Sequence, residues 1–72
     1  MNEQLTFFLG DIWVDQVGNK LQYVYEFKTC CSPTMYHFKQ LDSTSVYAYD
    51  SYGRRLSHLH TPVVGFDLVE KL

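Results

Sequence analysis

The residues best suited to chemistry lie in the stretch "SHLH" at positions 57–60. His58 and His60 are two residues apart, so on a strand their imidazoles would point to the same face and could share a metal ion. Further ligands could come from elsewhere in the chain, namely His37, Asp50, Cys30 and Cys31. Zinc sites usually show C-x2-C or H-x3-H spacings, which are absent here. The sequence therefore favours half-exposed histidines that hydrogen-bond to tyrosines, and we expect no metal and no cofactor.

Cysteine and histidine could also form a catalytic pair. A thiolate at Cys30 or Cys31, activated by His37, would be a nucleophile. The sequence shows no third group to orient the imidazole, no oxyanion loop, and none of the motifs GxGxxG, P-loop, GxSxG or HExxH. Because the two cysteines are neighbours, they cannot close a useful loop, and we expect reduced thiols in a cytoplasmic protein. The sequence indicates a protein that is not an enzyme.

Length and charge restrict the other functions. The 72 residues fit one small β-domain spanning 1–72, and a chain of this size buries only about 60% of its unfolded surface. Six Lys or Arg residues stand against eight Asp or Glu, and the only adjacent basic pair is Arg54 and Arg55. Proteins that bind phosphate backbones usually carry a basic stripe. No apolar run approaches the ~18 residues of a membrane helix, and "LTFFLG" is too short for a signal peptide. We therefore expect neither a polyionic partner nor a membrane.

Short strands would position these residues. Ring-bearing and aliphatic side chains alternate with others over residues 21–28, which predicts a strand with one buried face, made by Leu21, Tyr23, Tyr25 and Phe27. Similar runs predict strands at Ile12–Val14, Leu21–Lys28, Met35–Leu41, Val46–Asp50 and Arg55–Thr61, and in the closing segment 63–72. Gly18 and Asn19 tolerate positive φ and predict a two-residue hairpin loop. We predict an all-β fold: a small antiparallel barrel or strongly bent sheet of five to six strands, with at most a short terminal helical turn.

The run "GDIWVDQVGNKLQYVYEF", residues 10–27, resembles the opening of SH3-like small barrels, the group that includes SH3, Tudor and KOW domains. The shared features are an entry strand with "GDxW", a glycine turn and a long alternating strand, over about the middle fifty residues. The chain is also similar to short accessory proteins of bacteriophages, many of which are one small β-domain that binds a host protein. It carries only Lys20 at the first turn, where a KOW domain has more basic residues, and no "ALYDY"-like run. The resemblance therefore implies a fold and no particular ligand.

The residues predicted to bind a partner gather around the turn "SYGRR", residues 51–55. Tyr52 is expected to be exposed beside Arg54 and Arg55, and tyrosine and arginine often dominate the binding energy of interfaces. The full predicted set is Trp13, Tyr47, Tyr49, Tyr52, Arg54, Arg55 and His58. A Tudor-like aromatic cage for a methylated side chain could also be assembled, from Trp13, Tyr47, Tyr49 and Asp50.

Three functional hypotheses follow. The leading one is a non-catalytic protein-interaction module, such as a phage or mobile-element protein that inhibits or redirects a protein of the host cell. The alternative is a nucleic-acid-binding small barrel of the KOW or Tudor type, using Lys20, Arg54 and Arg55 with stacking tyrosines. A metal-dependent protein using His58 and His60 is the third. An unpaired edge strand would also favour a homodimer.

Overall fold

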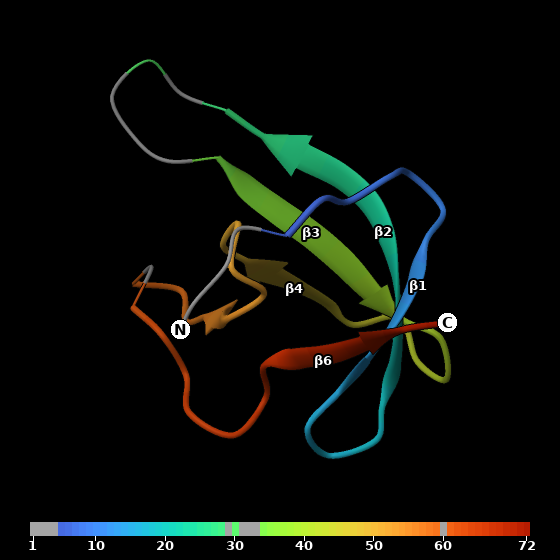
Figure 1. Ribbon diagram of the computed structural model, residues 1–72. Coiled ribbons are helices and arrows are strands. Elements are labelled where there is room, and N and C mark those ends of the chain that lie inside the picture. Colours follow the sequence, from blue (N-terminus) through green and yellow to red (C-terminus); the bar gives the residue numbers. More distant parts are fainter. Residues whose placement is uncertain (1–4, 29, 31–33, 60) are drawn as a thin grey trace.

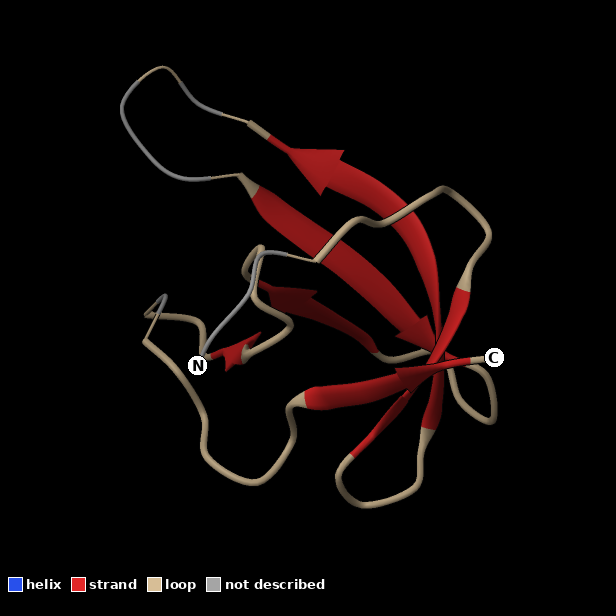
Figure 2. Ribbon diagram, viewed as in Figure 1, coloured by secondary structure: helices blue, strands red, loops and turns tan. Residues whose placement is uncertain are grey.

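The protein is a single curled antiparallel sheet of six strands, shown in Figures 1 and 2. The computed structural model describes residues 5–28, 30, 34–59 and 61–72. The strands are β1 (Ile12–Asp15), β2 (Lys20–Phe27), β3 (Met35–Gln40), β4 (Val46–Tyr49), β5 (Arg55–Leu56) and β6 (Leu68–Lys71). Within the described part of the chain there is no helix, and hence none long and apolar enough to cross a membrane. The predicted all-β fold is confirmed, as a strongly bent half-barrel.

The sheet curls until its two edges, β5 and β6, come close to each other at the β4–β5 turn. The strand order is β5-β4-β3-β2-β1-β6, so a five-strand meander is followed by a strand that returns beside β1. The start of β6 also contacts the β4–β5 turn, where the Leu68 N–H donates to the Gly53 carbonyl at 2.8 Å. The same turn receives the N-terminal segment, whose Leu5 N–H donates to the Ser51 carbonyl at 2.7 Å. Figure 1 shows this segment crossing the concave side of the sheet.

Two of the turns share the sequence pattern D-x-x-G-x. In Asp15–Asn19 and in Asp50–Arg54, the glycine N–H donates to the aspartate carbonyl at 3.1 Å, and the aspartate N–H donates to the last carbonyl at 3.0 Å. Gly18 and Gly53 take positive φ values of 101° and 82°, a region that other L-residues rarely adopt. This is the three-residue hairpin loop with a left-handed third residue. The predicted two-residue loop Gly18-Asn19 is therefore wrong, because Asn19 already pairs with Asp15 and the loop consists of the three residues 16–18.

The concave face of the sheet holds an aromatic core. Its buried apolar residues come from five strands, and they are Trp13, Leu21, Tyr23, Phe38, Tyr49 and Leu68. Phe7, from the segment that crosses this face, packs among four rings at centroid distances of 4.9–5.9 Å: those of Trp13, Tyr23, Tyr36 and Phe38. Most of these pairs meet edge to face, the favoured geometry for aromatic rings. The core therefore includes a side chain that no strand supplies.

At a β-bulge halfway along β2, the side chains that pointed to one face of the sheet begin to point to the other. Tyr23 pairs with Phe38 and Tyr25 pairs with the next residue back on β3, His37, so Val24 is an extra residue on β2. Because side chains alternate, one extra residue moves everything after it to the other face. Tyr25 and Phe27 are consequently 50% and 49% exposed on the convex face. The prediction that both belong to the buried face is wrong.

The predicted strand Arg55–Thr61 is much shorter in the structure. It ends at Leu56, and the chain then turns back on itself, with the Ser57 N–H donating to the Thr61 carbonyl at 2.8 Å. Beyond this turn, Pro62 pairs with Leu56, and the Val63 N–H donates to the Arg55 carbonyl at 2.8 Å.

Candidate functional site

The convex face of the sheet carries a row of neighbouring side chains from four strands. Tyr25, His37, Ala48 and Leu56 follow one another across the β2–β3, β3–β4 and β4–β5 pairings. Together with half-exposed Phe27, they put aromatic and aliphatic surface where solvent can reach it. An apolar patch of this kind on a folded protein commonly marks an interaction site.

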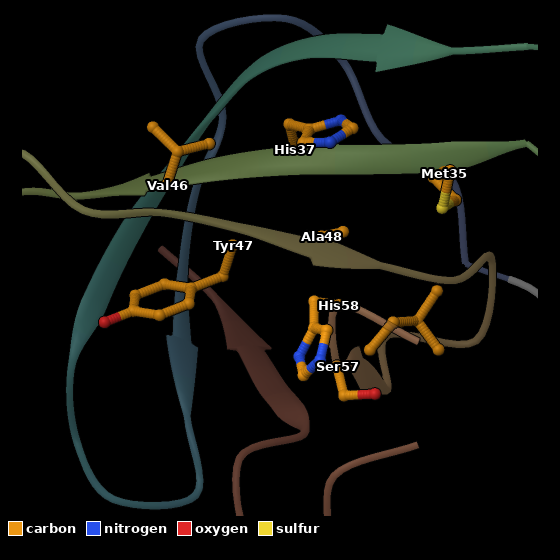
Figure 3. Close-up of a pocket in the computed structure, with 8 residues that line it drawn as sticks. Met35, His37, Val46, Tyr47, Ala48, Ser57 and His58 are labelled. Carbon is orange, nitrogen blue, oxygen red and sulfur yellow. The ribbon is translucent and has the colours of Figure 1, made fainter. Parts of the chain in front are cut away.

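A groove lies over this row, on β3 and β4. It has a volume of about 330 Å³ and is lined by Met35, His37, Val46, Tyr47, Ala48, Leu56, Ser57 and His58. In Figure 3, Ala48 lies between His37 on one side and His58 on the other. The groove exists because alanine is the smallest side chain in its row, flanked across the pairings by histidine and leucine.

His37 forms one wall of the groove. Its ring stacks on Tyr25 with 4.3 Å between centroids and 10° between planes. Its Nδ1 is buried, and no hydrogen-bond partner for that atom occurs among the described residues. Burial lowers the pKa of His37 below its ordinary value of 6.5. The folded protein therefore holds a neutral imidazole against the tyrosine at neutral pH.

The lowered pKa of His37 predicts a stability that depends on pH. Since the unfolded chain takes up the proton more readily than the folded one, the free energy of unfolding should fall as pH drops through 6.5 toward the lower folded pKa. In a His37→Phe variant, which keeps a ring on Tyr25, this part of the decrease should be absent. Urea unfolding of both proteins between about pH 7.5 and 5.5 measures the difference. Equal slopes for the two proteins would contradict the prediction.

Arg55, predicted to be exposed beside Arg54, is instead 8% exposed and lies in the interior. Its guanidinium carbon is 3.9 Å from the centroid of the Tyr47 ring and 4.4 Å from that of Phe66. Its Nε and Nη2 both donate to the Tyr49 hydroxyl, at 3.0 and 2.9 Å, and Nη2 lies 3.6 Å from an oxygen of Asp15. Arg55 is therefore an internal cross-link between aromatic faces, where its charge is compensated.

Two other residues of the predicted binding set belong to the core. Tyr49 is fully buried, and burial raises its pKa although the Arg55 hydrogen bonds act in the opposite direction. Trp13 is also buried and packs edge-on against Phe7 at 5.4 Å. A partner cannot contact side chains in this position. Their burial corrects the expectation that they form a binding surface.

The parts of the predicted aromatic cage are used separately. Trp13 packs on Phe7, and Tyr47 packs on Arg55. Asp50 is occupied by its own turn, where its Oδ1 accepts from the backbone N–H groups of Tyr52 and Arg54 at 2.9 Å each. A cage for a methylated side chain is therefore not formed by these residues.

At the tip of the β4–β5 turn, Tyr52 has the exposure that the sequence predicted, and Arg54 lies beside it. Tyr52 is exposed, and the Arg54 guanidinium carbon lies 5.5 Å from its ring centroid. Arg54 Nε also donates to Asp50 Oδ2 at 2.8 Å. This ion pair holds the arginine in the turn and reduces the net positive charge that the turn presents to solvent.

His58, one residue of the predicted histidine pair, lies outside the strands. His58 is exposed in the turn after β5, and His60 lies outside the described residues, so the argument that a strand aligns them does not apply. In the described ranges, no three side chains of the His, Cys, Asp and Glu types are grouped closely enough to hold a metal ion. Cys30 is exposed in the β2–β3 connection, and Cys31 also falls outside the described residues.

The functional candidates that sequence reasoning missed are Tyr25, Phe27, His37 and Ala48, which meet on the convex face. A regular alternation over residues 21–28 places the first two in the core, and only the bulge at Val24 turns them outward. Since the run contains no glycine or other bulge signal, the alternation alone was misleading.

Comparison of the chain with protein-family models, with curated proteins and with solved structures finds no match.

Proposed function

We propose that the chain is a non-catalytic protein-binding module that contacts its partner through the convex face of β2, β3 and β4. The observation that carries the proposal is the outward turn of Tyr25 and Phe27 beside the groove. Burying about half of each ring in a complex would remove further apolar surface from water. Aromatic side chains of this kind are frequent binding hot spots, whereas their exposure costs a free monomer stability and solubility.

The finer form of the proposal is a small SH3-like module, encoded by a phage or mobile element, that inhibits or redirects a cytoplasmic protein of the host cell. The curled six-strand antiparallel sheet supports the likeness of architecture. The partner is a protein rather than a nucleic acid in this proposal because the predicted phosphate contacts are otherwise engaged. Arg55 is buried and Arg54 is paired with Asp50, which leaves Lys20 of that set.

A comparative co-purification tests the proposal. We expect a double variant, Tyr25→Ala with Phe27→Ala, to lose a partner that the unmodified protein retains from the native cell lysate. Truncating hot-spot side chains costs about 2 kcal/mol or more, which is roughly thirtyfold in affinity. The matched controls are Leu9→Ala and Val64→Ala, which remove still more exposed apolar side chains away from the convex face, and both should retain the partner.

Two results would contradict the proposal. One is a partner set that is the same for the double variant and the controls. The other is salt-dependent binding of the purified protein to single-stranded RNA that the double variant loses, since stacking aromatic side chains would then serve a nucleic acid.

A further inference from the structure

On the side of the groove, the convex face carries basic side chains. Those that β2, β3 and the groove present there are Lys20, Lys39, His37 and His58, whereas Glu70 on β6 lies on the same face beyond β1, paired with Val14. Although the chain as a whole has a net charge of −2, no carboxylate of the described residues lines the groove. Glu26 lies on the opposite face, paired with Tyr36, which packs against the core. The part of the face around the groove is thus electrostatically complementary to an acidic segment of a partner.

The groove also has a definite size. About 330 Å³ is at the lower end of the range for small-molecule clefts, roughly 300–1,000 Å³. It is open rather than enclosed, and its floor and walls near Ala48 are apolar, formed by Met35, Val46 and Leu56. One large side chain of a partner would fit inside it. Lys39 pairs across the ladder with Val46 and so lies at the end of the groove.

Within the protein-binding function proposed above, we infer that the groove takes a large apolar side chain from an extended peptide segment whose neighbouring residues are acidic. The apolar side chain lies over Ala48, and a carboxylate next to it pairs with Lys39. His37, with the Tyr25 ring stacked behind it at 4.3 Å, forms the wall beside the inserted side chain. The partner segment is therefore recognised by one apolar anchor and by its negative charge.

Short fluorescein-labelled peptides of one common frame serve as probes. The first carries a central leucine flanked by aspartates, the second replaces the aspartates with lysines, and the third replaces the leucine with alanine. Fluorescence anisotropy should show binding of the first, and at least about tenfold weaker binding of the other two. Equal binding of all three, or binding of none, overturns the inference.

Variants of the protein locate the site. Ala48→Leu fills the groove from its floor, and Lys39→Glu reverses the charge at its end. Each variant should bind the first peptide about tenfold more weakly, or weaker still. Leu9→Ala is the matched control and should bind unchanged. Thermal unfolding establishes that each variant is folded, and if Ala48→Leu does not fold, Lys39→Glu decides the outcome. Binding that neither variant weakens would overturn the inference.

The two proposals fail separately. If Ala48→Leu retains the cellular partner that the Tyr25 and Phe27 double variant loses, the convex face binds a protein but the groove does not take an anchor. The inference is then wrong while the proposed function stands. If the double variant retains the partner as well, both are wrong.

Discussion

Replacing Asp15 by alanine is expected to leave most of the protein unfolded at room temperature. The side chain is 2% exposed, and its Oδ1 accepts from three backbone N–H groups, those of Val17, Gly18 and Asn19, at 2.8–3.0 Å. Its Oδ2 accepts from the Asn19 side chain and faces Arg55 at 3.6 Å. Alanine would leave a buried guanidinium without its carboxylate, and the Val17 and Asn19 N–H groups without their acceptor, whereas the Gly18 N–H would keep its bond to the carbonyl of residue 15. Removing one partner of a buried pair costs about 3–5 kcal/mol.

That loss is comparable with the whole stability of the domain. Chains of this length rarely gain more than about 3–5 kcal/mol from a single core. Urea unfolding followed by circular dichroism or by Trp13 fluorescence would measure the change. A loss below about 1 kcal/mol would show that the Arg55 charge and the turn are satisfied in another way.

Asp50 provides the matched control, because it occupies the equivalent position of the second D-x-x-G-x turn. Its Oδ1 accepts from two backbone N–H groups, and its Oδ2 pairs with an arginine whose side chain is 41% exposed. Asp50→Ala should therefore cost only about 1–2 kcal/mol, the range for lost hydrogen bonds near solvent. The difference between the two variants isolates the contribution of the buried arginine.

The bent antiparallel sheet could be predicted from the sequence because alternation and turn residues report local geometry. The alternation of side chains was enough to predict the strands at residues 20–27, 35–40 and 46–49. The bulge at Val24 could not be predicted, since nothing in its own run distinguishes it and its cause lies in the pairing with β3. The facing of Tyr25, and with it the candidate site, depended on that one residue.

Arg55 illustrates a second feature that could not be predicted from the sequence. An arginine next to a glycine turn is normally solvated, so exposure was the physical expectation. Its burial requires three things from distant parts of the chain, namely rings at Tyr47 and Phe66, a hydroxyl at Tyr49 and a carboxylate at Asp15. Such a set is assembled only by the tertiary fold. The repeated D-x-x-G-x pattern was visible in the sequence, and it would have identified both aspartates as turn residues.

Phe7→Ala is expected to have the second large effect on stability, although no strand contains Phe7. Its ring contacts four others, and edge-to-face pairs add to the burial of apolar area. A buried Phe→Ala change costs about 3–5 kcal/mol, and because Phe7 is only partly buried we expect about 2–4 kcal/mol. Thermal or urea unfolding, with the exposure of Trp13 as the probe, measures this loss.

The neighbouring residue is the control for that prediction. Phe8 is 61% exposed, and its ring lies 5.7 Å from the Lys71 ammonium. Phe8→Ala should cost at most about 1 kcal/mol, the value of an exposed cation–π contact. Equal losses for the two variants would mean that the segment 5–11 stabilises the sheet through its backbone, by the bonds from Leu5 to Ser51 and from Gly10 to Tyr23. A large loss for Phe7 alone would instead show that this single ring completes the core, which the six strands leave open on their concave side.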